Sequence, residues 1–178
     1  PELADTAIFY SISNAQKGLS GVSFGDFLIK KVVDHLSHEL PNLKTFATLS
    51  PIPGFSKWLD IKLQSNDEVI STQNKKALSE LSSSKIDQLS LKNLLDSPLW
   101  YQDNSKTEIA EPILIKLAAK YLIEERQKSS DNALDGVKHF HLSNGARVER
   151  INWLADISPK GIKQSAGMMV NYLYPLDK

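Results

Sequence analysis

The amino-acid sequence predicts a mixed α/β (α+β) fold, in which a sheet is flanked by helices and carries a helical insertion. Three stretches of the chain support this prediction. Residues 6–50 have the pattern strand, loop, helix, strand; residues 55–127 have a helical pattern; and strand patterns return within residues 137–174. A strand, a crossover helix and a second strand form the repeating unit of α/β sheets, so residues 6–50 are predicted to be a βαβ unit.

The first predicted strand, residues 6–13, is apolar on both faces, which is typical of a central strand covered on both sides. After a polar, glycine-containing loop, a helix is predicted from Ser23, a good N-cap residue, to about Leu40, just before Pro41. Its apolar residues recur at i+4 spacing and predict a stripe that packs on the sheet. They are Phe24, Leu28, Val32, Leu36 and Leu40, with Val33 beside them.

The second predicted strand, residues 45–49, runs into Ser50-Pro51-Ile52-Pro53-Gly54. Two prolines remove two backbone donors and fix φ, so this corner is predicted to be neither strand nor helix. The hydroxyl of Ser50 would then lie at the C-terminal end of a strand, where open α/β sheets bind their ligands. Taken alone, the stretch fits a proline-rich turn with a capping serine equally well.

Residues 55–127 predict short helices near 55–63, 74–83 and 86–96, then a longer helix over about 108–127 with Pro112 in its first turn. The apolar face of the long helix consists of Ile113, Leu114, Leu117, Tyr121 and Leu122. Residues 128–135 are predicted to be a polar linker.

The C-terminal part predicts a strand at residues 137–142 and a second at about 146–153, joined by Asn144-Gly145, a strong signal for a tight hairpin turn. Ser158-Pro159 predicts the start of a short helical turn, and residues 167–174 a last strand. Within that strand Asn171 and Tyr172 could line a ligand-binding cleft, but they are expected to be ordinary strand and core residues.

Length and composition bound the function. The 178 residues suffice for one domain, and 21 basic against 21 acidic residues give no field that indicates nucleic acid or membrane partners. The absence of cysteine excludes disulfides, thiolate nucleophiles and cysteine-based zinc sites. No apolar run is long enough for a membrane span and no signal peptide is visible. Because residue 1 is proline, the chain is expected to begin inside a longer protein.

The loop before the first helix is one chemical candidate. Gly18, Gly21 and Gly25 match neither a P-loop nor a Rossmann fingerprint. Alone they indicate an ordinary loop, but at the N-terminus of a crossover helix they also suit a phosphate or pyrophosphate group.

Histidine is the second candidate. In a strand, His139 and His141 would share a face and could bind a metal, but no cysteine or acidic residue offers an obvious third ligand, so no metal site is predicted. A single catalytic histidine fits better, since imidazole both gives and takes protons near neutral pH. His35 and His38 are expected on the exposed side of the first helix. Ser50 lacks a Gly-x-Ser-x-Gly elbow, which argues against a hydrolase nucleophile.

Several motifs together resemble those of the malonyl-CoA decarboxylase family. They are Phe9-Tyr10-Ser11-Ile12-Ser13, Gly21-Val22, Phe27-Leu28-Ile29-Lys30, Leu49-Ser50-Pro51-Ile52-Pro53-Gly54-Phe55, Phe140-His141-Leu142 with Asn144-Gly145-Ala146, and Arg150-Ile151-Asn152-Trp153. The resemblance covers nearly the whole chain, in the family's order. It implies a sheet similar to that of the GNAT acyltransferases, and a family architecture with a helical domain before the catalytic one.

The resemblance also implies how the chain is organised. Residues 1–178 would be the C-terminal part of the GNAT-like catalytic domain, without the N-terminal helical domain and the first strands. Within it, residues 6–50 would be the CoA-binding βαβ unit, residues 55–127 the helical insertion, and residues 137–174 strands carrying the catalytic histidine.

Site residues follow from the same resemblance. Ser50 and His141 match the family's catalytic serine and histidine. The malonyl-CoA-binding loop matches Ser20, Gly21, Val22, Ser23, Phe24, Gly25 and Asp26. This loop departs from the acyltransferase pattern Gln/Arg-x-x-Gly-x-Gly/Ala, so the individual pyrophosphate contacts are left open.

The implied function is malonyl-CoA decarboxylase, a carboxy-lyase of fatty-acid or malonate metabolism that forms acetyl-CoA and CO₂. His141 would donate a proton to C2, Ser50 would orient the malonyl group or relay a proton, and backbone N–H groups of the first strand would stabilise the enolate. No cofactor is expected beyond the CoA of the substrate. The partners would be malonyl-CoA and acetyl-CoA, with a homo-oligomer in the full-length protein.

Two other functions fit the sequence less well, a GNAT-type acyl-CoA N-acyltransferase and a non-catalytic malonyl-CoA-binding protein. The presence of both Ser50 and His141 argues against the second. The expected compartment is the cytoplasm in a bacterium, or the mitochondrion or peroxisome in a eukaryote.

Overall fold

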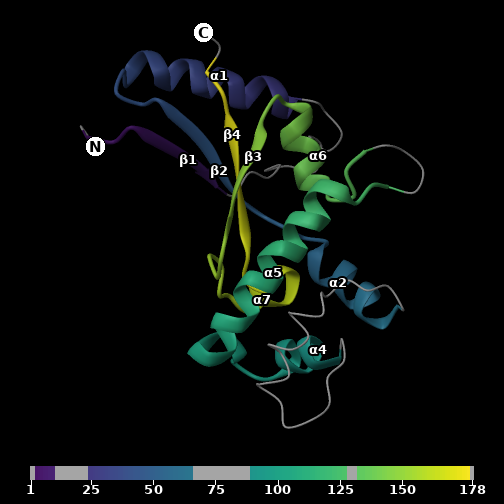
Figure 1. Cartoon of the computed structure of the whole chain (residues 1–178). Coiled ribbons are helices and arrows are strands. Elements are labelled where there is room, and N and C mark those ends of the chain that lie inside the picture. Colours follow the sequence, from purple (N-terminus) through teal and green to yellow (C-terminus); the bar gives the residue numbers. More distant parts are fainter. Residues whose placement is uncertain (1–2, 11–23, 66–88, 128–131, 177–178) are drawn as a thin grey trace. The chain divides into compact units, whose positions relative to one another are not determined.

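The computed structural model describes residues 3–10, 24–65, 89–127 and 132–176 (Figure 1). Its elements, in chain order, are β1 (Thr6–Tyr10), α1 (Phe24–Glu39), β2 (Thr45–Pro51), α2 (Phe55–Gln64), α4 (Leu89–Asp96), the 3₁₀ helix η2 (Trp100–Gln102), α5 (Asn104–Glu124), α6 (Gly136–Ser143), β3 (Arg147–Asn152), α7 (Pro159–Ser165) and β4 (Met169–Tyr174). They confirm a mixed α/β fold with a four-stranded sheet flanked by helices.

The described residues form two compact units. Unit 1 contains the residues up to Pro51, Gly136–Arg150 and the residues from Val170 onward. Unit 2 contains Ile52–Asp135 and Ile151–Met169. The predicted βαβ unit lies in unit 1, whereas the helical insertion lies in unit 2.

The sheet has the strand order β1-β2-β4-β3, so the last strand in sequence lies between the second and third (Figure 1). Strands β1 and β2 are parallel, with Thr6 opposite Thr45 and Tyr10 opposite Leu49. This pairing across α1 confirms the predicted βαβ unit. Strand β2 is longer than predicted, because it includes Ser50 and Pro51. A residue before proline prefers extended geometry, and a proline in the last position need not donate to the ladder, so the corner continues the strand.

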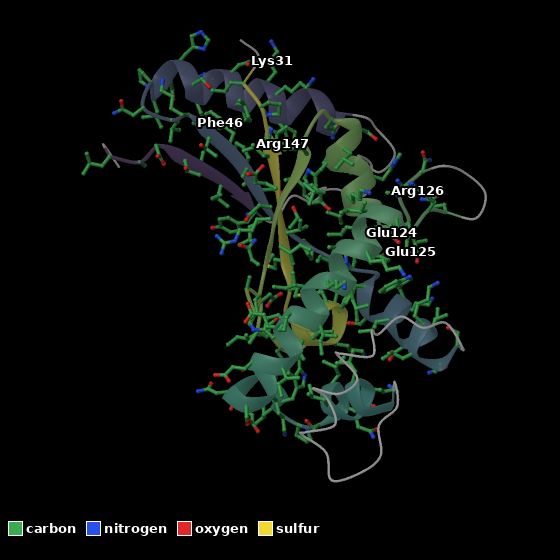
Figure 2. All side chains as sticks on the ribbon, viewed as in Figure 1. Lys31, Phe46, Glu124, Glu125, Arg126 and Arg147 are labelled. Carbon is green, nitrogen blue, oxygen red and sulfur yellow. The ribbon has the colours of Figure 1, made fainter. Side chains whose placement is uncertain are left out.

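Helix α1 covers the predicted range, but its apolar stripe is wrong at the C-terminal end. Ile29 and Val33 are buried, whereas Leu40 follows the helix and is 50% exposed. Residues at i+4 spacing advance about 40° around the helix at each step, so a stripe of five such residues leaves the buried face. In unit 1 the sheet's core includes Phe46 on β2 (Figure 2), which is fully buried. Its ring stacks on that of Phe9 of β1, with ring centroids 6.4 Å apart.

Unit 2 is built around an aromatic cluster. The ring centroids of Phe55, Trp58 and Tyr121, from α2 and α5, lie 5.3–6.0 Å apart. The predicted apolar face of α5 is confirmed. Its buried residues are Ala110, Ile113, Leu114, Leu117, Ala118, Tyr121 and Leu122.

The start of α5 differs from the prediction. Asp103 caps the helix by accepting hydrogen bonds from the backbone N–H groups of Ser105 and Lys106, so α5 begins at Asn104. Pro112 therefore lies inside the helix and not in its first turn. The carboxylate cap of Asp103 therefore starts the helix earlier than the position of Pro112 predicted.

After α5 the chain turns back on itself. The guanidinium of Arg126 donates from Nη1 to the carbonyl oxygens of Ile123, at 2.7 Å, and Glu125, at 3.3 Å, near the end of the helix (Figure 2). Arg126 also forms an antiparallel bridge with Ala133, and Asp135 is buried. The described part of the predicted polar linker is therefore packed. The predicted helix at residues 74–83, the strand residues 11–13 and residues 128–131 lie outside the described residues.

The largest difference from the prediction is α6, since residues 137–142 were expected to form a strand. A six-residue apolar run is compatible with either structure, and periodicity cannot separate them. Asn144-Gly145 closes this helix: Gly145 has φ +80°, its N–H bonds to the Leu142 carbonyl, and the Ala146 N–H bonds to the His141 carbonyl, both at 3.0 Å. This is a Schellman cap, so the expected hairpin turn is in fact a helix terminus.

The remaining C-terminal predictions are confirmed. Strands β3 and β4 fall within the predicted ranges. Ser158 caps α7, its Oγ accepting the Gly161 N–H at 3.1 Å, and Pro159 occupies the first turn. Among the described helices, none is both long and apolar enough to cross a membrane.

Candidate active site

Ser50 lies at the C-terminal end of β2, as predicted, and is 4% exposed. Residues two apart in a strand share a face, so Ser50 and Thr48 point to the same side of the sheet. Thr48 is fully buried. The Ser50 hydroxyl donates a hydrogen bond to Thr48 Oγ1 at 2.9 Å.

His141 lies in the last turn of α6 and is 2% exposed. Its Nε2 is 3.1 Å from Ser50 Oγ. Ser50 and His141, which the resemblance implies to be catalytic, are 91 positions apart in the chain and in hydrogen-bond contact inside unit 1.

Strand β4 supplies the other side of the imidazole. The Tyr174 hydroxyl is 2.8 Å from His141 Nδ1. Tyr172, two residues earlier on the same face, stacks on the imidazole with ring centroids 4.4 Å apart and planes 25° apart. Tyr172 is fully buried and so is a core residue, as expected, but the ring it packs against is that of His141. These contacts hold the imidazole by both nitrogens and by one face.

Burial sets the charge of this histidine. Desolvation lowers the pKa of His141 to about 4, because the low-dielectric surroundings disfavour the imidazolium. The ring is therefore neutral at pH 7, with a proton on one nitrogen and a lone pair on the other. Such a ring can accept a proton at one nitrogen while it donates from the other, so Tyr174, His141 and Ser50 form a possible path for a proton.

The expected malonyl-CoA-binding loop is described only in part. Ser20, Gly21, Val22 and Ser23 lie outside the described residues. Phe24, Gly25 and Asp26 form the first turn of α1, consistent with the predicted helix start. Their role stays a prediction.

The other histidines do not join the site. Successive residues in a helix differ by about 100°, so His139 and His141 face nearly opposite sides of α6, and the shared strand face expected for them is wrong. His35 and His38 are exposed on α1 as predicted, and His35 Nε2 lies 3.3 Å from Glu39 Oε1. Within the described residues, no group of three or more histidine or acidic side chains is placed to hold a metal ion.

Sequence reasoning missed two members of the site, Thr48 and Tyr174. Alternation along each strand could have placed Thr48 on the face of Ser50 and Tyr174 on that of Tyr172. No local signal shows that the strands containing them are neighbours, however, so their meeting around His141 could not be inferred.

Comparison with known proteins identifies the family. A family model described as the malonyl-CoA decarboxylase C-terminal domain matches residues 1–178. Malonyl-CoA decarboxylase, mitochondrial, from Anser anser anser is 43% identical over 182 residues, and that from Rattus norvegicus 43% over 178; the alignments cover 99% and 97% of this chain. The chain spans 36% of the length of both relatives.

Solved structures give the same result. The crystal structure of malonyl-CoA decarboxylase from Agrobacterium vitis matches with a TM-score of 0.83 and 45% identity, covering 99% of this chain and 40% of that one. The crystal structure of the decarboxylase from Rhodopseudomonas palustris matches with a TM-score of 0.82 and 44% identity, covering 98% and 37%. The chain therefore belongs to the malonyl-CoA decarboxylase family.

Proposed function

We propose that the protein to which this chain belongs is a carboxy-lyase that converts malonyl-CoA to acetyl-CoA and CO₂. The observation that carries the proposal is the contact between Ser50 Oγ and His141 Nε2, 3.1 Å, at the C-terminal end of a sheet strand. Both residues occur in the motifs that match the family, and the family model covers the whole chain.

The reaction breaks the bond between C2 of the malonyl group and its carboxylate carbon. The electron pair of that bond moves into the thioester carbonyl, CO₂ leaves, and an enolate remains. The thioester is thus the electron sink, and the proposed reaction requires neither a metal nor a redox cofactor. Donors that face the enolate oxygen would lower the barrier, and backbone N–H groups of β1 are proposed for this role.

C2 must then take up a proton. The Ser50 hydroxyl orients the malonyl group and hands its proton to C2, while Ser50 Oγ receives the Nε2 proton of His141. The Tyr174 hydroxyl replaces it at Nδ1. After the product leaves, water supplies a proton to Nε2 and Nδ1 returns its proton to Tyr174, which restores the starting arrangement of protons. A thioester enolate is a much stronger base than a phenolate, so the net transfer of a proton from Tyr174 to C2 is thermodynamically favourable. This path differs from direct donation by a charged His141, because the pKa of about 4 keeps the imidazole neutral.

The test is release of CO₂ and acetyl-CoA from malonyl-CoA by the full-length protein, its Ser50→Ala variant and a control variant. Ser37→Ala is a matched control, since the Ser37 hydroxyl donates to the Val33 carbonyl within its own helix, α1. We expect Ser50→Ala to abolish turnover and Ser37→Ala to leave it unchanged.

Two other outcomes would contradict the decarboxylase, and a third would contradict the role of Ser50. Consumption of acetyl-CoA with an amine would indicate an N-acyltransferase. Binding of malonyl-CoA without turnover by the unsubstituted protein would indicate a sensor. Equal activity of both serine variants would remove Ser50 from the mechanism.

The remaining expectations are proposals with simple tests. Without a metal in the mechanism, EDTA leaves the rate unchanged. Residues 20–26 bind the CoA portion, and substitutions there raise KM more than they lower kcat.

The full-length protein is a homo-oligomer, which light scattering measures. The mitochondrial relatives favour a mitochondrial compartment if the source is eukaryotic.

A further inference from the structure

Thr48 holds two strands together beside the proposed catalytic residues. Its Oγ1 accepts the backbone N–H of Tyr172 at 3.2 Å, and its carbonyl oxygen accepts the side-chain amide of Asn171 at 2.6 Å. Both bonds join β2 to β4 through side-chain atoms. Ser50 on β2 and Tyr174 on β4, each two residues from these bonds, supply the two hydroxyls that contact opposite nitrogens of His141.

The Thr48 hydroxyl oxygen also accepts a hydrogen bond from the Ser50 hydroxyl. Ser50 Oγ–H donates to Thr48 Oγ1 at 2.9 Å, so the proton of Ser50 points away from His141. Only lone pairs of Ser50 Oγ then face Nε2, and a hydrogen bond between these two atoms requires the ring proton to be on Nε2. Since a neutral imidazole has one N–H, Nδ1 carries the lone pair and accepts the Tyr174 hydroxyl.

We infer that Thr48 is a positioning residue that sets the proton order of the site, keeping Nε2 of His141 protonated toward Ser50. The inference rests on the proposed function and deepens it, because a relay from His141 to Ser50 works only in this order. In the reverse order Ser50 donates to Nε2 and Nδ1–H donates to Tyr174, and His141 has no proton to give to Ser50.

The first experiment compares Thr48→Val, Thr48→Ser and Thr45→Val in the full-length protein. Valine keeps the shape of threonine but lacks the acceptor for Ser50, whereas serine keeps it. Thr45→Val makes the same change at the start of the same strand, away from Ser50. We expect Thr48→Val to lower kcat for malonyl-CoA about tenfold with KM within about twofold, and the other two variants to stay within about twofold of the unsubstituted enzyme.

The second experiment reads the ring proton directly. Nitrogen NMR of protein labelled with ¹⁵N in its imidazole rings separates a protonated from an unprotonated nitrogen, and His141→Asn identifies the signals of His141. We expect protonated Nε2 in the unsubstituted protein and in Thr48→Ser, and protonated Nδ1 in Thr48→Val. Damage to the fold alone would not exchange the two nitrogens.

Three results would overturn the inference. They are an unchanged kcat in Thr48→Val, the same ring proton in both Thr48→Val and the unsubstituted protein, and a Thr48→Ser variant as impaired as Thr48→Val. The NMR measurement needs no turnover, so it judges Thr48 even if the protein fails to release CO₂. Failure of the decarboxylase and failure of the positioning role are therefore separate outcomes.

Discussion

The two units bury different kinds of residue to a similar extent. In unit 2 the core around α5 is aromatic and aliphatic, with Phe55, Trp58 and Trp100 each nearly or wholly inaccessible. In unit 1 the interior next to Phe46 contains Thr48, Ser50 and His141, which are equally hidden from solvent. Depth of burial therefore does not distinguish the candidate active site from an ordinary core.

The difference lies in how the buried polar atoms are satisfied. A buried hydroxyl or imidazole without a hydrogen-bond partner is unfavourable by some 1–3 kcal/mol, so such groups are retained where they pair with one another. In unit 1 they pair in series, from Tyr174 through His141 and Ser50 to Thr48. A series of exchangeable protons can do chemistry, whereas the aromatic cluster of unit 2 can only stabilise.

The sharpest test of this comparison sets the buried histidine against an exposed one. His141→Asn removes the proposed relay and should lower kcat about 10³-fold, equivalent to about 4 kcal/mol. His38→Asn, on the exposed face of α1, should stay within about twofold. Steady-state decarboxylation of malonyl-CoA by both variants provides the measurement. Similar rates for the two would mean that the buried chain of protons is structural.

A substitution in unit 2 should show the opposite signature. Trp100 is 2% exposed and lies 6.0 Å from Trp153 between ring centroids. Trp100→Ala leaves a cavity and should lower the free energy of unfolding by about 3–5 kcal/mol. Urea unfolding measures this, and kcat per folded molecule should stay within about threefold. If Trp100→Ala lowered kcat without lowering the free energy of unfolding, unit 2 would contribute to the chemistry as well as to stability.

Acid should destabilise the protein through His141. Its pKa is lowered from 6.5 to about 4 on folding, so the unfolded chain binds this proton more readily. Above pH 6.5 His141 is neutral in both states and the free energy of unfolding is at its full value. As the pH drops toward 4, protonation of His141 in the unfolded chain lowers this free energy by about 3 kcal/mol. Urea midpoints at pH 7.5 and 4.5 should differ more for the unsubstituted protein than for His141→Asn.

His38→Asn is the control for the acid measurement and should keep the whole difference between the two midpoints. The rate should also show no acid limb near pH 6.5, since His141 is neutral throughout that range. A limb at pH 6.5 that disappears in His141→Asn would mean that the ring titrates as an exposed one.

Two buried tyrosines should respond to the same substitution in different ways. Tyr174→Phe removes the donor to His141 and should lower kcat about tenfold, with KM little changed. Tyr121 in unit 2 has its pKa raised by burial and by the nearby Asp135 carboxylate, to which it is hydrogen-bonded. Tyr121→Phe should instead lower the free energy of unfolding by about 1–3 kcal/mol and keep kcat within about twofold.

Kinetics and urea unfolding on both tyrosine variants provide these measurements. If Tyr174→Phe changes only stability, the phenol of Tyr174 is not part of the relay. If Tyr121→Phe lowers kcat while stability is unchanged, the two units do not separate chemistry from packing.

Much of the fold follows from local patterns in the sequence. The βαβ unit was predicted because residues 6–50 combine apolar strands with a helix that ends before Pro41. Ser158-Pro159 identified α7, since a serine cap followed by proline satisfies a helix start whatever surrounds it. Ser50 was placed at a strand end by the proline that follows it. The prediction failed for residues 137–142, where a short apolar run is ambiguous and the Asn-Gly signal belongs to a helix cap.

By itself, the sequence determined most of the segments that form strands and helices, where most of them end, and, through the resemblance to a family, that Ser50 and His141 belong together. These features depend on residues close in the chain or on motifs that can be read one at a time. Only the tertiary structure decided that β4 lies beside β2 and that α6 is helical. Strand order and register depend on contacts between residues more than a hundred positions apart, which no local pattern encodes. For that reason Thr48 and Tyr174, the outer members of the proton chain, emerged from the fold alone.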